Sequence, residues 1–385
     1  MRSGDASSPA ASPSSPSPAS GRSAGDAAAG GWRHGTAPRT AVLVVNLGTP
    51  DEPDTAAVRR YLAEFLGDPR VVEIPPLLWK PILHGIILRT RPAKSAAKYA
   101  SVWTPEGSPL AVWTRKQAVL LRGYLGERAQ PVLVEHAMRY GNPSIASVLD
   151  KLAAQGATRV LILPMYPQYS AATTGTVNDE VMRWALTQRW QPELRFVGAH
   201  HDDSGYIDAL AARMQAHWQA EGRADRLVLS FHGMPARTLD LGDPYFCHCQ
   251  KTARLLRERL SLREDQVLVT FQSRFGKARW LEPYTEPTLV KLAQQGIGSV
   301  DVFCPGFVAD CLETLEEIDM EARKAFLGAG GRTFNYVSAL NDRHEWIAAL
   351  AALAIRHMQG WPVLGADAKV LEASATRAIA LGARG

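Results

Sequence analysis

Residues 227–235, with the sequence LVLSFHGMP, decide the fold. A short apolar run that ends at glycine and proline is typical of a strand buried on both faces of a sheet. Similar runs recur along the chain, and segments with the apolar spacing of helices separate them. Strands that alternate with helices in this way indicate βαβ units, and therefore parallel sheets flanked by helices.

The order of these segments predicts an α/β protein made of two similar halves, residues 40–190 and residues 191–340. We expect a closing helix within residues 341–360 and a loose, Ala- and Gly-rich tail over residues 361–385. The predicted strands are 40–50, 132–137, 159–164, 194–197, 227–231, 267–271 and 300–304. The predicted helices are 55–65, 113–125, 144–155, 177–187, 207–220, 251–260, 288–295, 312–326 and 342–358.

Residues 1–39 are rich in Ser, Ala, Pro and Gly. We expect this extension to be disordered, because it has too little apolar surface to offset the entropy of an ordered chain. It lacks the apolar centre of a signal peptide. A transit peptide has less support, since Asp5, Asp26 and the prolines disfavour an amphipathic helix.

The composition is that of a soluble globular protein, with 46% hydrophobic and 21% charged residues. The net charge of +5 is scattered without a Lys/Arg run, so we expect no nucleic-acid partner. No apolar run reaches the roughly 18 residues that a transmembrane helix needs. Four cysteines without a secretory signal indicate a reducing cytosol rather than a disulfide framework.

Two polar residues that follow predicted strands are candidates for chemistry. His232 follows the strand at 227–231, and Glu313 follows the strand at 300–304. Ligands of open parallel sheets bind beyond the carboxyl ends of the strands, so we expect the imidazole and the carboxylate to share one cleft. Each residue also has a simpler explanation: His232 as part of a turn, and Glu313 as the partner of Asp310 in a capping box.

Glu313, Glu317 and Glu321 fall on one face of the predicted helix, four residues apart. Like charges at this spacing destabilise a helix by roughly 0.2–0.5 kcal/mol per pair. The row is therefore either a solvated face or a path for cations. The sequence slightly favours solvation, because Glu316 and Asp319 place further acid on other faces.

Two further motifs have both a functional and a structural interpretation. Residues 163–176 place hydroxyls and aromatic rings after a strand, as in the wall of a pocket for a planar ligand or in a capped loop. Cys247-His248-Cys249 is spaced more closely than the cysteine pairs of zinc sites, which favours free thiols. No Walker loop or G-x-G-x-x-G motif follows a strand, so nucleotide binding has little support.

The ordered set of motifs resembles that of the bacterial ferrochelatases, enzymes that insert Fe²⁺ into a porphyrin in haem synthesis. The resemblance spans about residues 41–358. The matching segments are 45–50 (VNLGTP), 107–110 (GSPL), 137–141 (AMRYG), 163–175, 230–235 (SFHGMP), 271–276 (FQSRFG) with Trp280, and 311–315 (CLETL).

The resemblance implies two Rossmann-like halves with the active-site cleft between them, and a lyase that converts protoporphyrin IX and ferrous iron into protohaem. It makes His232 and Glu313 the catalytic and metal-binding residues: His232 accepts a pyrrole proton or holds the metal, and Glu313 supplies an oxygen ligand or an onward proton acceptor. Glu317 and Glu321 would pass protons or metal. The implied porphyrin-binding residues are Tyr166, Arg139, Tyr140, Trp280, Arg89 and Arg91.

Two departures from the family pattern narrow these expectations. Cys311 stands where many members carry a histidine, so no role of that histidine transfers to this chain. No cysteine follows Cys311, so we expect no [2Fe–2S] cluster and no permanently bound cofactor.

Three alternatives stay open: a coproporphyrin ferrochelatase, a cobalt or nickel chelatase, and a non-catalytic porphyrin or haem carrier. The expected state is a monomer or weak dimer in the cytoplasm. The apolar stretch from Ile74 to Leu88 resembles a lip that would contact the inner face of a membrane.

Overall fold

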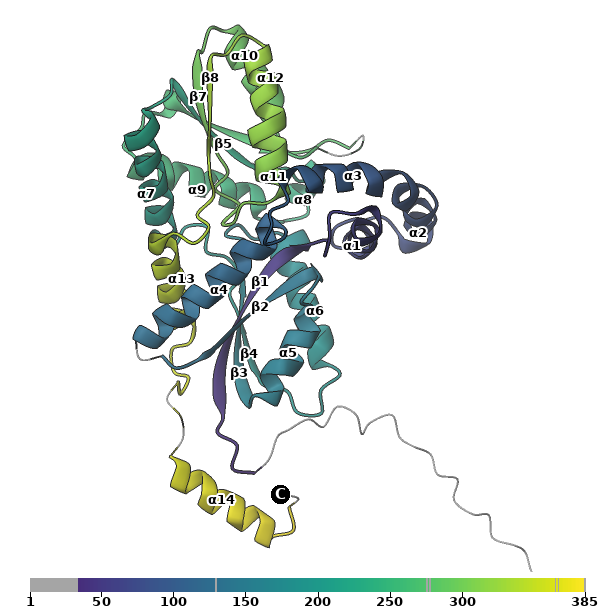
Figure 1. The fold of residues 1–385 in the computed structure, drawn as a ribbon, viewed down its shortest axis with the longest axis vertical. Helices are drawn as coiled ribbons and strands as arrows, with labels where there is room; N and C mark the ends of the chain where they lie inside the picture. Colours follow the sequence, from purple (N-terminus) through teal and green to yellow (C-terminus); the bar gives the residue numbers. More distant parts are fainter. Residues whose placement is uncertain are drawn as a thin grey trace, which may run out of the picture.

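The computed structural model describes residues 34–128, 130–274, 276, 278–363, 365 and 367–383. Most of the extension expected to be disordered, residues 1–33, lies outside this range. The described chain folds around two parallel four-stranded sheets, which Figure 1 shows in separate parts of the molecule. The predicted α/β fold class with two parallel sheets is confirmed.

The two sheets repeat one topology. Their strand orders are β2-β1-β3-β4 and β6-β5-β7-β8, so the first strand of each half lies between its second and third strands. The direction of winding therefore reverses beside β1 and beside β5, and such switch points are where open α/β sheets bind ligands. The strands are β1 (Arg39–Thr49), β2 (Leu133–Gly141), β3 (Ala157–Pro164), β4 (Glu193–Phe196), β5 (Arg226–His232), β6 (Val267–Gln272), β7 (Ser299–Phe303) and β8 (Thr333–Val337).

Helices flank both sheets. The first half contains α1 (Thr55–Gly67), α2 (Pro76–Ile82), the π-helix η1 (Leu83–Ile87), α3 (Leu88–Val102), α4 (Pro109–Glu127), α5 (Ile145–Ala154), the π-helix η2 (Ala171–Gly175) and α6 (Thr176–Ala185). The second contains α7 (Ser204–Glu221), α8 (Ala236–Asp240), α9 (Tyr245–Arg259), the 3₁₀ turn η3 (Glu264–Gln266), α10 (Thr285–Gln294), α11 (Leu312–Thr314), the π-helix η4 (Leu315–Ala322) and α12 (Arg323–Gly328). The chain continues through α13 (His344–His357) and α14 (Ala368–Ala380).

Several of these elements were not among the predicted ones. Helices α2 and α3 contain Pro81 and Pro92, and proline inside a segment normally argues against a helix. Strand β8 was not predicted either. The tail over residues 361–385, expected to be loose, contains α14. Its Ala-rich sequence has high intrinsic helix propensity, although none of its side chains is buried.

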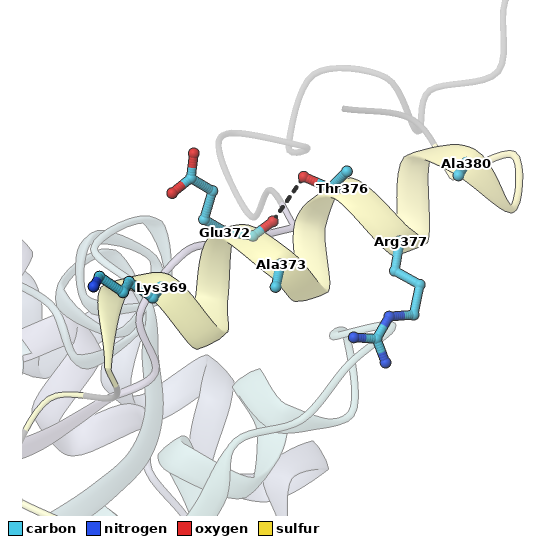
Figure 2. Close-up of a pocket in the computed structure, with 6 residues that line it drawn as sticks. All are labelled: Lys369, Glu372, Ala373, Thr376, Arg377 and Ala380. Carbon is cyan, nitrogen blue, oxygen red and sulfur yellow. Dashed lines mark hydrogen bonds between the residues drawn. The ribbon is translucent and has the colours of Figure 1, made fainter.

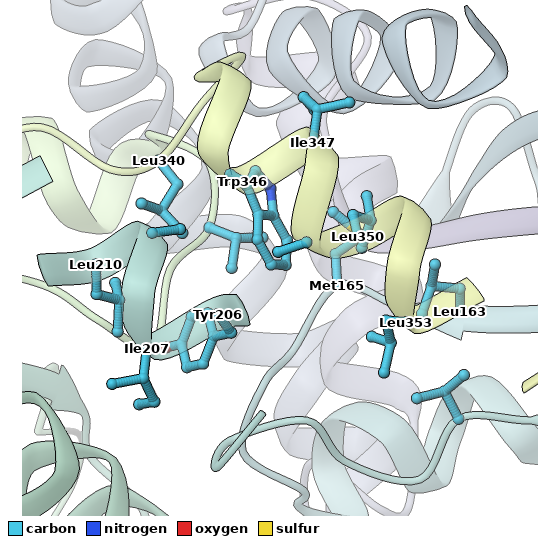
Figure 3. Close-up of a cluster of buried hydrophobic side chains, with 14 of the residues drawn as sticks. Leu163, Met165, Tyr206, Ile207, Leu210, Leu340, Trp346, Ile347, Leu350 and Leu353 are labelled. Atoms are coloured by element: carbon cyan, nitrogen blue, oxygen red, sulfur yellow. The ribbon is translucent and has the colours of Figure 1, made fainter. Parts of the chain in front are cut away.

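One hydrophobic core is continuous across both halves. Figure 3 shows α13 in this core, with Trp346 near Tyr206 of α7 and Leu350 further along the helix. The same cluster includes Val44 of β1 and Leu229 of β5, so both sheets contribute to it. The closing helix therefore packs against both halves and holds the ends of their strands in a fixed relation.

The segment that connects the two halves contains a buried histidine. His200 lies between β4 and α7 and is only 2% exposed. Its ring stacks on Trp346, with the centroids 6.0 Å apart, and both ring nitrogens lack hydrogen-bond partners among the described residues. Burial lowers the pKa of His200 from 6.5 to about 4, so the ring is neutral at pH 7.

His200 should make the fold sensitive to acid. Because folding lowers its pKa from 6.5 to about 4, the unfolded chain binds the proton first as the pH falls. The stability contributed by the neutral ring is therefore complete above pH 6.5 and is lost as the pH falls towards 4. The loss amounts to about 3 kcal/mol, at about 1.4 kcal/mol per pKa unit. His200→Phe keeps a ring against Trp346 without the titrating nitrogens, and should flatten this decline in urea titrations.

His84→Phe provides the matched control, because His84 lies exposed on η1. This control should keep the pH dependence of the wild type. A decline in the free energy of unfolding of His200→Phe as steep as in the wild type would contradict the assignment to His200.

Candidate active site

His232 ends β5 at the switch point of the second sheet. Its Nδ1 lies 2.7 Å from the carbonyl oxygen of Gly233. Because a carbonyl oxygen can only accept, Nδ1 carries the proton of the neutral ring and Nε2 keeps a free lone pair. The hydroxyl of Tyr245 donates to the His232 carbonyl oxygen at 2.9 Å and holds the strand end in place. The half-buried imidazole can therefore accept a proton or ligate a metal through Nε2.

Trp280 lies against the turn that follows His232. A side-chain carbon at Gly233 would lie 3.2 Å from the Trp280 ring and 2.5 Å from the carbonyl oxygen of Gln272, so only glycine fits there. The indole Nε1 of Trp280 is buried and has no hydrogen-bond partner among the described residues. A ring face and an unused donor thus lie close to the catalytic histidine predicted from sequence.

Glu313 lies in α11, in the connection that follows β7. The structure does not bear out the alternative that Glu313 forms a capping box with Asp310. Thr314 makes the capping bonds instead, since its hydroxyl accepts from the Cys311 amide at 3.0 Å. Asp310 accepts hydrogen bonds from Ala339 N at 3.1 Å, Asn341 Nδ2 at 2.7 Å and the Thr314 hydroxyl at 3.2 Å, so its partner in this turn is Thr314 and not Glu313. The Glu313 carboxylate is not used to cap its own helix.

The surroundings of Glu313 come from both halves of the chain. Burial raises the pKa of the Tyr61 and Tyr99 phenols well above the usual value, and the charge of Glu313 raises both further. Burial also raises the pKa of the Cys311 thiol, which is hydrogen-bonded to Glu313. The carboxylate therefore faces neutral hydroxyl and thiol groups, with α1 and α3 of the first half beside it.

The other two carboxylates of the acidic row have separate partners. Glu317 accepts from the backbone amide of Ser273 at 2.6 Å and from Nε2 of Gln272 at 3.3 Å. Glu321 is exposed and pairs with Nζ of Lys98 in α3 at 2.9 Å. Both residues lie on the π-helix η4. Helices of this type are rare in proteins, and those that occur are often found at functional sites. Gln272 therefore contacts both Glu313 and Glu317. Glu321 instead links the two halves at the surface through Lys98.

Arg139 and Tyr140 are buried within the protein. Arg139 pairs with Asp68 at 2.6 Å and donates to the Thr176 hydroxyl at 2.7 Å, and the Tyr140 hydroxyl donates to Asp68 at 3.0 Å. Burial opposes ionisation of Asp68, but hydrogen bonds from the Thr176 hydroxyl, the Arg70 amide and the Tyr140 hydroxyl, with the Arg139 charge, outweigh it and lower the pKa. The network joins the ends of α1 and β2 to the start of α6.

Tyr166 lies just after β3 of the first sheet. Its hydroxyl is buried without a hydrogen-bond partner in the described part of the chain, and burial raises its pKa well above the usual value. An unpaired buried hydroxyl costs about 1–3 kcal/mol. Tyr166 and Trp280 therefore each present a buried donor that a bound ligand could satisfy.

Helices α2, η1 and α3 form an arm that projects from the rest of the molecule in Figure 1. Its lip, residues 74–88, exposes large apolar side chains, including Leu77 at 91%, Leu78 at 64% and Ile86 at 58%. Arg89 is exposed just after the lip. Arg91 is half-buried, and burial lowers its pKa. Among the described residues, no helix is long and apolar enough to cross a membrane.

Two surface hollows lie away from His232 and Glu313. Figure 2 shows one of about 500 Å³, lined only by residues of α14 and so lacking an opposing wall. The other, of about 270 Å³, is lined by Asp68 and Arg139 of the buried network together with Glu64 and Glu180. Neither contains His232 or Glu313.

Comparison with known proteins identifies the family. The family model described as Ferrochelatase matches residues 39–358, most of the chain. The chain belongs to the ferrochelatase family. It is 69% identical over 353 residues to a protein named Ferrochelatase from Methylibium petroleiphilum, which covers 91% of this chain and 97% of that protein. A protein of the same name from Polaromonas sp. is 63% identical over 357 residues, covering 91% and 97%. The resemblance stated from sequence is confirmed.

A solved structure agrees with the fold. SirB from Bacillus subtilis with Fe³⁺ superposes with a TM-score of 0.50 and 15% identity, covering 83% of this chain and 96% of that one. At this identity the similarity bears on the fold alone.

Some residues of this ferrochelatase-family site were missed from sequence. Tyr61, Tyr99 and Asp68 carry no motif that separates them from ordinary helix residues, and only the folded chain brings them to the strand ends. Gln272 and Ser273 lie inside the matched FQSR segment and directly after a predicted strand. That placement was a usable signal for both.

Asp68 should be essential to the stability of this edge of the site. Removing its charge in Asp68→Asn leaves Arg139, whose side chain is only 7% exposed, without its close partner. Breaking a buried pair in this way typically costs about 3–5 kcal/mol. Asp51→Asn is the control, since the Asp51–Arg60 pair is exposed and such pairs contribute about 0–1 kcal/mol. Equal free energies of unfolding for the two variants in urea would contradict this role.

Proposed function

We propose that this chain inserts Fe²⁺ into protoporphyrin IX to form protohaem, and that His232 and Glu313 carry out the reaction. The observation that carries the proposal is their common position. His232 ends β5, Glu313 follows β7, and Gln272 of β6 makes hydrogen bonds to the segments of both. The extent of identity to proteins named Ferrochelatase supports the reaction class.

The reaction exchanges two pyrrole protons for one Fe²⁺ ion, so the site needs proton acceptors and metal ligands. Neutral His232 has Nε2 free to accept a pyrrole proton, because Nδ1 is engaged with Gly233. Glu313 supplies an oxygen ligand for incoming Fe²⁺ or the next proton acceptor. Fe²⁺ accepts mixed imidazole and carboxylate ligation, and weak ligation lets the ion pass into the ring.

A flat macrocycle hides its nitrogen lone pairs, so binding should bend the porphyrin towards the metal, with the strain supplied by surrounding contacts. We assign Trp280 and Tyr166 to the macrocycle, since each has an unpaired buried donor. Arg89 and Arg91, beyond the lip, would meet the porphyrin carboxylates. Arg139 and Tyr140 have partners within the protein, which favours a role in shaping the pocket wall.

Glu317 and Glu321 are proposed to conduct protons out or metal in. Glu317 is hydrogen-bonded next to Glu313, and Glu321 reaches the surface, so the two connect the interior with solvent. Lys98 partly neutralises the outer end of this row.

We propose that no resident cofactor takes part. An iron–sulfur cluster needs four thiolate ligands in most proteins. Burial raises the pKa of the Cys304 and Cys311 thiols well above the usual value, which disfavours thiolates there. Coproporphyrin differs from protoporphyrin only in edge substituents, so parallel assays with both porphyrins distinguish these substrates. A non-catalytic carrier would retain haem and insert no metal.

Replacing either proposed catalytic residue should abolish insertion without abolishing porphyrin binding. His232→Ala removes the proton acceptor, and loss of such a group typically lowers rates by about 10²–10⁴-fold. Glu313→Gln keeps the shape but removes the charge, and should cause a similar loss. Anaerobic turnover of Fe²⁺ and protoporphyrin measures activity, and fluorescence quenching measures porphyrin binding. His84→Ala on exposed η1 is the control, and retained turnover in both site variants would contradict the assignment.

We also propose that the protein is cytoplasmic and that the lip contacts the inner face of a membrane. Leu77→Ser with Leu78→Ser should reduce binding to lipid vesicles about tenfold or more, because burying each leucine is worth roughly 1.5–3 kcal/mol. Turnover with detergent-solubilised porphyrin should not change. Leu381→Ser provides the control, since Leu381 beyond α14 is 84% exposed and lies outside the lip. Equal vesicle binding by the lip variant and this control would remove the lip from membrane contact.

A further inference from the structure

Gln272 lies at the end of β6, directly opposite His232 in the parallel pair of β5 and β6. It is only 5% exposed. Its carbonyl oxygen accepts from the Gly233 amide at 2.7 Å, the residue next to His232. The backbone of Gln272 therefore fixes the turn that directs the His232 side chain.

The side chain of Gln272 uses every hydrogen-bonding position of its amide group. Its Oε1 accepts from the Ser230 hydroxyl at 2.8 Å and from the Cys304 thiol at 3.7 Å. Its Nε2 donates to the Glu313 carbonyl oxygen at 2.7 Å and to Oε2 of Glu317 at 3.3 Å. A side-chain amide has two lone pairs on oxygen and two N–H donors, so the four contacts saturate it. The Glu313 carbonyl oxygen can only accept, so the NH₂ group faces the acidic helix and Oε1 faces Ser230 and Cys304.

The next residue reinforces this contact. Ser273 has a φ of 66°, in the left-handed region that non-glycine residues seldom adopt. This turn directs the Ser273 amide at Oε1 of Glu317, 2.6 Å away, and the Ser273 hydroxyl binds the same carboxylate. A strained backbone at a strand end that serves a carboxylate is typical of a site whose geometry matters.

We propose that Gln272 is a positioning residue that sets the placement of His232 relative to Glu313 and Glu317. The inference rests on the proposed roles of those three residues. Through its backbone Gln272 holds the histidine turn, and through its side chain it holds the first turn of the acidic helix. Ser230 and Cys304 act through Gln272 by fixing the orientation of its amide.

Gln272→Met tests this role, because methionine fills a similar volume and makes none of the four side-chain contacts. We expect kcat for Fe²⁺ insertion to fall about 10- to 100-fold, the scale on which misplacing a reacting group by about 1 Å slows catalysis. The KM for porphyrin should stay unchanged, since the side chain of Gln272 contacts the helix rather than the proposed ring-binding residues. Gln272→Glu keeps the acceptor for Ser230 but loses both donors, and should show the same kcat loss.

A double-mutant cycle separates positioning from simple structural support. Ser230→Ala should lower kcat less than Gln272→Met does. The double variant Ser230→Ala/Gln272→Met should lose no more than Gln272→Met alone, because Ser230 acts through the amide. Additive losses in kcat would overturn this pathway.

Gln117→Met is the matched control. Gln117 is also a fully buried amide, and its Nε2 donates to the carbonyl oxygens of Val308 and Asn341, both at 2.8 Å. It should lower the melting temperature and leave kcat per folded molecule unchanged. The same pattern in Gln272→Met would overturn the inference while leaving the proposed function intact. An inactive wild type would instead reject the proposed function itself.

Discussion

A side chain at position 233 would collide with the neighbouring strand, and the arrangement of the site depends on this constraint. The Gly233 amide donates to the Gln272 carbonyl oxygen at 2.7 Å, and a Cβ on Gly233 would lie only 2.5 Å from that oxygen. The close approach continues the pairing of β5 with β6 past the last residue of the strand. It also brings Trp280 against the turn. The backbone next to His232 is therefore held from both sides, and the His232 ring adds its own contact to the Gly233 carbonyl oxygen.

The carboxylates of the acidic helix repel one another, and the surrounding groups offset this repulsion. Each carboxylate has different neighbours. Glu313 lies near neutral phenols and a thiol, and Glu317 accepts two hydrogen bonds from Ser273. Burial and the nearby Glu321 raise the pKa of Glu316, and Lys98, which pairs with both carboxylates, partly offsets this rise. Because Lys98 belongs to α3, the arm of the first half stabilises a helix of the second. The charges that favour a cation near Glu313 thus also join the two halves.

Sequence reasoning succeeded where one local pattern decides the structure. Short apolar runs ending in glycine or proline predicted β1 to β7 and placed His232 and Glu313 at strand ends. It failed where a partner far away in sequence decides. The Asp310–Glu313 capping box was locally sound, but Asp310 instead binds Tyr336 in β8 and Asn341 beyond it.

The contacts of Arg139 and Tyr140 also depend on a distant partner, while their predicted role in porphyrin binding stays a prediction. A motif can associate both with a porphyrin pocket, yet Asp68, which binds them, lies about seventy residues earlier and carries no signal of its own. Local sequence also misjudged the arm and the tail. The prolines inside α2 and α3 argued against helices there. The Ala-rich sequence of α14 forms a helix although none of its side chains is buried.

Cys311 now has a physical role in place of the histidine that many family members carry. Burial raises its pKa, as does the nearby charge of Glu313, so the thiol stays protonated at neutral pH and is hydrogen-bonded to that carboxylate. An imidazole there could accept a proton near pH 7, whereas this protonated thiol forms only weak hydrogen bonds. Under the proposed function, the acceptors for the two pyrrole protons are then His232 and the carboxylates. Their relative placement has to be correspondingly exact, and it is Gln272 that contacts both sides.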